Sequence, residues 1–119
     1  MQYLLLIYGN ETYVNKLPSG EQGKILEEYM DFTKSIAASG HLRGGNELDL
    51  TSKATTVRVR NNERVVTDGP FAETKEQLGG YYLVEAKDLK EAIGIAARIP
   101  SVRWGSIEIR PIVPHEMPS

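Results

Sequence analysis

Residues 2–8 read QYLLLIY and residues 81–86 read YYLVEA, and these two stretches set the architecture that we expect for the chain. Each is a short apolar run beside a turn-forming pair, Gly9-Asn10 for the first and Gly79-Gly80 for the second. Short runs with such flanks favour strands over helices. Both runs are apolar on both faces, so we expect them to be central strands of one sheet, buried on both sides.

Residues 19–39 have the spacing of an amphipathic helix, with apolar side chains on one stripe and charged ones elsewhere. Ser19 with Gln22 three residues later resembles a capping box. Gly40 is placed to end the helix in a left-handed conformation. The apolar stripe consists of Ile25, Leu26, Tyr29, Phe32 and Ile36.

A second, shorter helix is expected to begin at Asp88, where Glu91 completes another capping-box pattern, and to stop at Pro100. Residues 106–113, SIEIRPIV, then alternate as a final strand. The polar tail at 114–119, PHEMPS, is expected to fray. The inner stripe expected for this helix consists of Leu89, Ala92, Ile93, Ala96 and Ile99.

The middle of the chain predicts a hairpin. Residues 54–60, ATTVRVR, alternate cleanly, and residues 64–67, RVVT, return after a tight turn at Asn61-Asn62-Glu63. Residues 41–50 give a weaker strand that is broken by Gly44-Gly45. The order β-α-β-β-β-α-β is the split-βαβ, ferredoxin-like α+β plan with an extra hairpin. A length of 119 residues fits a single domain over 1–119.

This plan predicts a homodimer. Two helices can cover only one face of such a sheet, yet the strands at 2–8 and 81–86 are apolar on both faces. A second copy related by a twofold axis is the commonest way to cover the other face. The alternative is an open face with scattered apolar residues, which is common. We favour the dimer because the apolar excess is contiguous in two strands.

The composition excludes several classes of function. There is no cysteine, which rules out disulfides, thiolate metal sites and a cysteine nucleophile. The two histidines, His41 and His115, are too few for a three-histidine metal site, so we expect no metal and no cofactor. A net charge of −2 argues against nucleic acid and anionic membranes as partners. Neither a phosphate-binding glycine motif nor a signal peptide occurs, so a soluble cytoplasmic protein is expected.

Asp68 is the first candidate for chemistry. It precedes Gly69-Pro70 and then Phe71, in a connection longer than most in compact domains. Turn chemistry alone explains an aspartate there, because its side chain can accept from a backbone N–H two residues on. The aromatic Phe71 suggests instead that the segment packs inward. A carboxylate held beside an aromatic and away from water could act as a general acid or base.

Glu73, Lys75 and Glu76 follow in the same connection, where a second acid and a cation near Asp68 would suit a ligand. A solvated loop or helical turn explains them equally simply, and from the residues alone we favour that interpretation.

His41 follows the end of the first helix, where it could assist Asp68 or simply interact with the helix dipole. Tyr29, Tyr81 and Tyr82 each combine packing with a hydroxyl group. Because successive strand residues point to opposite faces, Tyr81 and Tyr82 must diverge. If the connection does bind a ligand, the candidate ligand-binding residues are Phe71, Glu73, Lys75 and Tyr82.

The stretch DGPFAETKEQLGGYYLVE, residues 68–85, resembles the YCII-related family in its DGPF-domain branch. The pattern D-G-P-F-x-E-x-K-E-x-L-x-G-Y/F-x-L runs uninterrupted from Asp68 to Leu83. The flanking segments agree, so the resemblance covers essentially the whole chain. It implies a ferredoxin-like fold that dimerises as an α/β barrel.

The resemblance leaves the function open. Family members have been proposed as enzymes that use a His–Asp pair, and one relative is a dehydrochlorinase of chlorinated aromatics. DGPF members also lie beside extracytoplasmic-function sigma factors, which implies an accessory role. Here Asp68 matches the acidic position, but the histidine position corresponds to Tyr29, so the pair is absent or rebuilt with Tyr29 or His41.

Two functions follow from these residues and this resemblance. One is a small dimeric domain that binds a small organic ligand at Asp68 or assists a sigma-factor system. The other is an enzyme for proton transfer or elimination, with Asp68 as general base and Tyr29 or His41 assisting.

Overall fold

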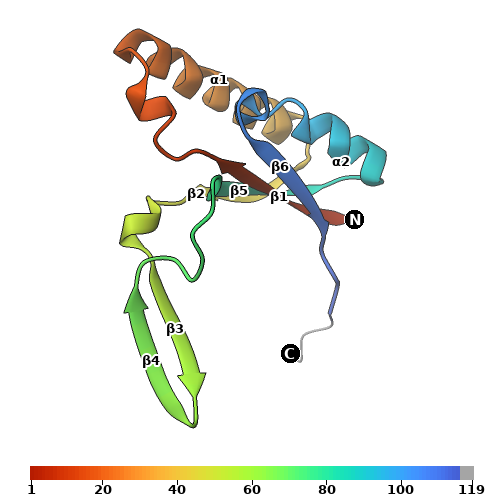
Figure 1. The fold of residues 1–119 in the computed structure, drawn as a ribbon. Coiled ribbons are helices and arrows are strands. Elements are labelled where there is room, and N and C mark those ends of the chain that lie inside the picture. The colour runs from red at the N-terminus through yellow and green to blue at the C-terminus, as the bar shows by residue number, and fades with distance from the viewer. Residues whose placement is uncertain (116–119) are drawn as a thin grey trace.

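The computed structural model describes residues 1–115, and the tail at 116–119, where fraying is expected, lies outside the described residues. Two helices and six strands follow one another in the order β-α-β-β-β-β-α-β, which has one strand more than the order predicted from the sequence (Figure 1). They are β1 (Gln2–Gly9), α1 (Ser19–Ala38), β2 (Leu42–Glu47), β3 (Thr55–Arg60), β4 (Glu63–Asp68), β5 (Gln77–Glu85), α2 (Leu89–Ala96) and β6 (Ser106–Pro111). Three short 3₁₀ helices, η1 (Val14–Lys16), η2 (Thr51–Lys53) and η3 (Pro100–Arg103), lie in the connections.

Four strands form one antiparallel sheet in the order β2-β5-β1-β6. The two strands expected at the centre, β1 and β5, are the inner pair. Both helices lie on one side of this sheet (Figure 1). The arrangement confirms the predicted α+β fold and is consistent with the ferredoxin-like plan.

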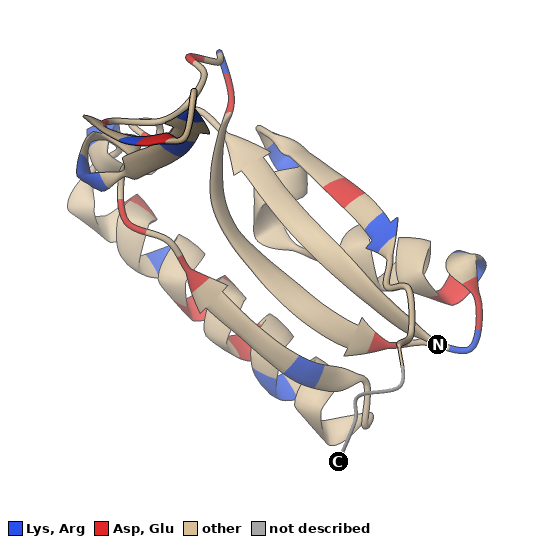
Figure 2. Ribbon diagram, turned by 90° about the horizontal axis from the view of Figure 1, so that it is seen from below, with Lys and Arg blue, Asp and Glu red and all other residues tan. Residues whose placement is uncertain are grey.

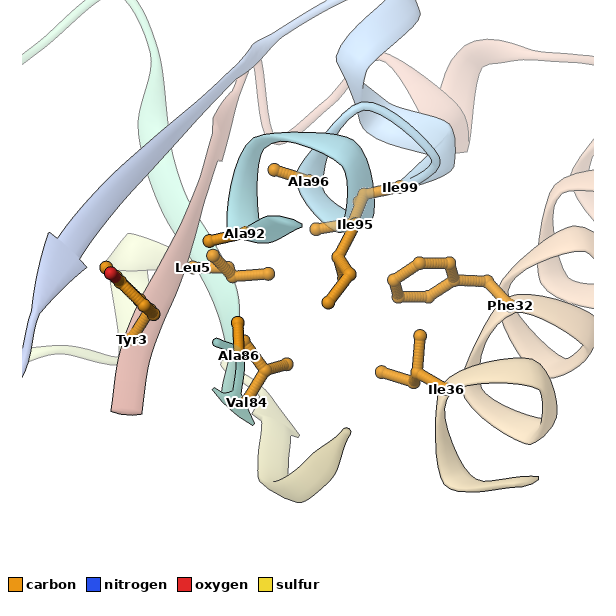
Figure 3. Close-up of a cluster of buried hydrophobic side chains, with 10 residues drawn as sticks. All are labelled: Tyr3, Leu5, Phe32, Ile36, Val84, Ala86, Ala92, Ile95, Ala96 and Ile99. Carbon is orange, nitrogen blue, oxygen red and sulfur yellow. The ribbon is translucent and has the colours of Figure 1, made fainter. Parts of the chain in front are cut away.

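The core lies between the helices and the sheet (Figure 3). Leu5 of β1, Ile36 of α1 and Val84 of β5 are completely buried there. Phe32 meets Tyr82 edge to face, with ring centroids 5.2 Å apart. The cluster contains Tyr3, Leu5, Phe32, Ile36, Val84, Ala86, Ala92, Ile95, Ala96 and Ile99.

The other face of the sheet carries Leu4 and Leu6 of β1 opposite Leu83 and Tyr81 of β5. All four are half-buried in the single chain. No charged residue lies on β1, and charges on the other strands of this sheet lie toward the edges and ends (Figure 2). We call this surface the open face.

Strands β3 and β4 form a separate two-stranded sheet, which we call the arm, residues 55–68. The arm extends away from the body on the side opposite the helices (Figure 1). Its turn is shorter than predicted, because only Asn61 and Asn62 connect the strands, with φ of 53° and 64°. Such paired left-handed residues are typical of a type I′ hairpin turn.

The ends of the two helices show which capping predictions hold. The predicted N-cap at Asp88 is confirmed, because its side chain accepts from the Glu91 N–H, but the Glu91 carboxylate accepts from the Lys87 N–H and not from that of Asp88, as a full capping box would require. Gly40 ends α1 with φ of 81°. The capping box at Ser19 and Gln22 is wrong. Pro18 occupies the cap position and Ser19 is already helical, so the Gln22 amide instead donates to the Leu17 carbonyl at 2.8 Å.

The helix stripes are only partly as predicted. On α1, Leu26 is 63% exposed, whereas Phe32 and Ile36 are buried. On α2, Leu89 and Ile93 are exposed, and Ile95 takes the inner place expected for them.

Candidate functional site: a cleft between helix α1 and the sheet

A cleft of about 530 Å³ lies between α1 and the ends of β1, β2 and β5. This volume is in the range of small-molecule sites. Its apolar lining includes Ile25 and Leu26 of α1 and Trp104, which stacks on Tyr13 with ring centroids 5.1 Å apart. Leu26 was predicted to face the core with the rest of its stripe. It is exposed instead because it forms part of the wall of this cleft.

Tyr29 and Ser101 form the first polar pair of this lining. Their hydroxyl groups share a short hydrogen bond, although 72 positions separate them in the sequence. Ser101 is 8% exposed, which places this pair at the inner end of the cleft. Burial raises the pKa of the Tyr29 phenol, and the charge of Glu47 adds to this effect, so Tyr29 stays neutral and able to donate.

Tyr82 and Thr33 form the second pair, with 2.8 Å between their hydroxyl oxygens. The Thr33 hydroxyl also donates to the backbone carbonyl of Tyr29 at 2.9 Å. Because a threonine hydroxyl has a single proton, the Tyr82 hydroxyl must be the donor to Thr33. The lone pairs of the Tyr82 oxygen are then available to accept a hydrogen bond from a molecule in the cleft.

Carboxylates line the outer part of the cleft. Glu47 and Asp49 are exposed, and Glu11 is half-buried. The Glu11 carboxylate accepts from the Thr51 backbone N–H at 3.0 Å and from the Thr51 hydroxyl at 2.6 Å. Glu11 thus fixes η2 to the segment after β1. Asp49 Oδ1 accepts from the Leu50 backbone N–H at 2.8 Å, so Glu47 and the other oxygen of Asp49 remain to interact with a ligand. None of the described residues that line the cleft is Lys, Arg or His.

The structure brings together only some of the residues predicted from the sequence. Tyr29 and Tyr82 both line the cleft, whereas Asp68, Phe71, Glu73 and Lys75 are exposed and do not line it. The expected inward packing of Phe71 is wrong within one chain, because this side chain is 78% exposed. The role of Asp68 stays a prediction.

His41 lies outside the cleft lining and is held by two hydrogen bonds. Its Nδ1 is 2.6 Å from the Ser39 hydroxyl, and its Nε2 is 3.0 Å from Glu91 Oε1. These contacts connect the start of β2 to α2 and give His41 a structural place. A catalytic role for His41 also stays a prediction.

Tyr81 and Tyr82 point to opposite faces of the sheet, as predicted. Tyr82 points to the helix side and Tyr81 to the open face, where its hydroxyl accepts from the Asn46 amide at 2.8 Å. Within residues 1–115, no three His, Cys, Asp or Glu side chains are grouped so as to hold a metal ion. No helix in that range is long and apolar enough to cross a membrane.

Sequence reasoning missed Ser101, Thr33 and the acidic rim. The hydroxyl residues gave no local signal, since each acts through a partner that is distant in the sequence. The sequence NELDL at 46–50 did carry a signal, because it places two acids just beyond a weak strand.

Comparison with known proteins extends over nearly the whole chain. The family model described as "YCII-related domain" matches residues 1–116. An uncharacterized protein of Rhizobium meliloti (strain 1021) is 34% identical over 124 residues, covering 100% of both chains.

A solved structure also resembles the fold. It is 5-chloro-2-hydroxyhydroquinone dehydrochlorinase from Burkholderia phenoliruptrix AC1100 in complex with 2,5-dihydroxybenzoquinone. The TM-score is 0.56 with 10% identity, over 95% of this chain and 94% of that one. At this identity the likeness establishes the fold alone.

Proposed function

The chain belongs to the YCII-related family, and we propose that it binds a small organic molecule in the cleft beside Tyr29 and Tyr82. The ligand is neutral or cationic and donates hydrogen bonds. The observation that carries this proposal is the acidic outer part of the cleft, in which Glu47 and Asp49 have no cationic side chain beside them among the described cleft residues.

Charge and hydrogen bonding select the same kind of ligand. An anion in the cleft would lie near carboxylates without a compensating cation, which is unfavourable. The Tyr82 oxygen and the carboxylates favour a ligand with hydroxyl or amine donors. The apolar wall at Ile25, Leu26 and Trp104 suits a single ring.

Three one-ring probes that differ in charge test the proposal. They are 4-hydroxybenzyl alcohol, which is neutral, tyramine, which is cationic, and 4-hydroxyphenylacetate, which is anionic. We expect the first two to raise the melting temperature and the third to have no effect. At a concentration of about 100 Kd, the added stability is about 2.7 kcal/mol.

Two tyrosine variants locate the binding. Tyr82→Phe removes the acceptor from the cleft, and we expect it to weaken the response to the alcohol and to tyramine. Tyr3→Phe removes a phenol hydroxyl from outside the cleft lining and serves as the matched control. A stronger response to 4-hydroxyphenylacetate than to tyramine would contradict the proposal.

Proton transfer on the bound molecule is a second candidate function. It is supported by the neutral Tyr29 phenol, which is hydrogen-bonded to the buried Ser101 inside the cleft. The fold is also compatible with this chemistry, since the structurally similar protein is a dehydrochlorinase. In this candidate Tyr29 is the proton donor. Asp68, which the sequence predicts as the general base, does not line the cleft of one chain, so its part in the reaction rests on the sequence prediction alone.

Deuterium exchange separates binding from catalysis. Resorcinol ring protons exchange slowly in D₂O, and proton NMR follows their loss. Catalysis predicts faster exchange with the wild type than with Tyr29→Phe or Asp68→Asn, whereas equal rates in all three leave binding as the function. Assembly as an α/β barrel and an accessory role beside a sigma factor stay predictions from the family resemblance.

A further inference from the structure

The two hydroxyl pairs of the cleft, Tyr29 with Ser101 and Tyr82 with Thr33, differ in which tyrosine keeps a proton for a ligand. A hydroxyl group has one proton to donate and two lone pairs to accept with. Two hydroxyl groups that share one hydrogen bond therefore keep one proton for another partner. The direction of each bond decides which group donates to a molecule in the cleft and which accepts from it.

In the first pair, Ser101 is the donor and Tyr29 the acceptor. Ser101 is 8% exposed, and within residues 1–115 its hydroxyl has a hydrogen bond to Tyr29 alone. If Tyr29 donated, the Ser101 proton would be buried without an acceptor, which is unfavourable. The opposite direction leaves no buried donor unpaired, because the half-buried Tyr29 then keeps its own proton for a partner in the cleft.

In the second pair, the tyrosine is the donor. The Thr33 hydroxyl donates to the Tyr29 backbone carbonyl at 2.9 Å, so Tyr82 donates to Thr33 across 2.8 Å. The Tyr82 proton is thus used inside the protein, and its lone pairs face the cleft. Tyr29 therefore presents a donor to the cleft, and Tyr82 presents an acceptor.

This donor and this acceptor lie close together. Thr33 is one helical turn beyond Tyr29 on α1, and side chains four residues apart are neighbours on a helix. The hydrogen bond to Thr33 brings the Tyr82 phenol to the same place. Burial raises the pKa of the Tyr29 phenol most, the hydrogen bond with Ser101 lowers it, and the nearby Tyr82 raises it again. The last effect agrees with adjacent phenols, and the second with Ser101 as donor.

A carboxamide is the small neutral group that matches such a pair. Its carbonyl oxygen accepts and its N–H donates, and both are attached to one carbon atom. A carboxylate lacks the donor, and an amidinium lacks the acceptor. A hydroxyl group has both functions on a single oxygen atom, whereas a carboxamide has them on two atoms, which suits two separate phenols.

We propose that the cleft recognises an aromatic carboxamide, with the amide carbonyl accepting from Tyr29 and the amide N–H donating to Tyr82. This inference rests on the proposed binding of a small molecule in the cleft, and it names the polar group of that molecule. The ring of the ligand lies against the apolar wall that contains Trp104. Because the amide is neutral, Glu47 and Asp49 do not repel it.

Three probes of nearly the same shape test the assignment. Benzamide has an acceptor and a donor, benzamidinium has donors and a positive charge, and benzoate has acceptors and a negative charge. Trp104 is the single tryptophan of the chain and lines the cleft, so its fluorescence follows the binding of each probe. We expect benzamide to bind and benzoate not to bind. Benzoate that binds as tightly as benzamide would overturn the proposal.

Two conservative variants separate the roles of the two tyrosines. Tyr29→Phe removes the donor, and we expect it to raise the Kd of benzamide about tenfold and that of benzamidinium much less. Tyr82→Phe removes the acceptor and should raise the Kd of both probes. Tyr3→Phe, outside the cleft lining, is the control, and circular dichroism checks the folding of each variant. Equal effects of Tyr29→Phe on the two probes would overturn the proposal.

Ser101→Ala tests the direction of the hydrogen bond between Ser101 and Tyr29. If Ser101 donates, its removal adds no donor to the cleft, and benzamide should bind no more tightly than to the wild type. Tighter binding would show that Tyr29 donates to Ser101, and the assignment would be wrong. If none of the three probes binds, the proposed function fails together with this inference, whereas binding without the expected tyrosine pattern contradicts this inference alone.

Discussion

The hydroxyl oxygen of Tyr82 lies 2.8 Å from the Oγ1 of Thr33, and this contact connects strand β5 to helix α1 within the cleft. The Thr33 hydroxyl donates a hydrogen bond to the Tyr29 backbone carbonyl, so the two tyrosines of the cleft are linked through one threonine. The cleft is therefore shaped by groups that also hold the fold together, and changes there affect stability and binding together.

Removal of the Tyr82 hydroxyl should cost little stability. In Tyr82→Phe the Thr33 hydroxyl keeps its bond to the Tyr29 carbonyl, so we expect a loss of about 0.5–1.5 kcal/mol in the free energy of unfolding. Thr33→Val removes both hydrogen bonds and should cost more. Urea denaturation measures both variants, and a smaller loss for Thr33→Val would contradict the assigned direction of the bonds.

The stability of the protein should fall at alkaline pH because of Tyr29. Burial raises the pKa of this phenol above 10.0, its ordinary value. The unfolded chain therefore releases the proton first, so stability is full below pH 10 and is lost as the pH rises toward the pKa of the folded state. Above pH 10, the free energy of unfolding should decline more steeply in the wild type than in Tyr29→Phe.

Absorbance of tyrosinate near 295 nm provides the direct measurement. The difference between the titrations of the wild type and Tyr29→Phe isolates one phenol among the six tyrosines. This phenol should titrate above its ordinary value. Titration at or below 10.0 would show that Tyr29 is in contact with water and not held inside the cleft.

Substitution of glycine by alanine should have opposite effects on stability at two positions. A Cβ at Gly105 would overlap the Tyr8 carbonyl oxygen, where the backbone enters β6, so we expect Gly105→Ala to cost about 1–3 kcal/mol. A Cβ at Gly94 on α2 meets nothing within 4 Å, and Gly94→Ala should stabilise by about 0.5–1 kcal/mol. Thermal unfolding of the two variants tests this, and a neutral Gly105→Ala would contradict the close approach of β1 to β6.

Most strands and turns of this chain follow from local sequence, but two glycine pairs and the helix faces do not. Gly79-Gly80, expected to precede the apolar strand, lies inside β5, and Gly44-Gly45, expected to break a strand, lies inside β2. Apolar runs, the Asn61-Asn62 turn and Gly40 each specify their own conformation through a few neighbouring residues. On α2, two apolar stripes could face the core, one beginning at Leu89 and the other at Ala92. They have the same spacing and are related by a rotation of roughly 60° about the helix axis. Only packing against β1 and α1 selects the second, which leaves Leu89 exposed.

The candidate site was predictable only where a residue had its own chemical signature. Tyr29 and Tyr82 stood out as tyrosines on expected elements, and both line the cleft. Ser101 did not, because its role depends on η3 bringing it to Tyr29 across 72 positions. Asp68 stood out through its sequence motif, yet its exposed place on the arm results from the separation of that arm from the sheet, which no local pattern encodes.

The N-terminal cap of α2 should contribute measurably to stability. The Asp88 carboxylate accepts from the Glu91 backbone N–H at 2.9 Å, and the Glu91 side chain accepts from the Lys87 N–H at 3.2 Å. Asp88→Ala leaves a helix-end donor without its partner and should cost about 0.5–2 kcal/mol. Asp88→Asn keeps an oxygen acceptor at the cap and should cost much less. Chemical denaturation at neutral pH distinguishes the two, and equal losses would show that the charge of Asp88, and not its capping bond, stabilises α2.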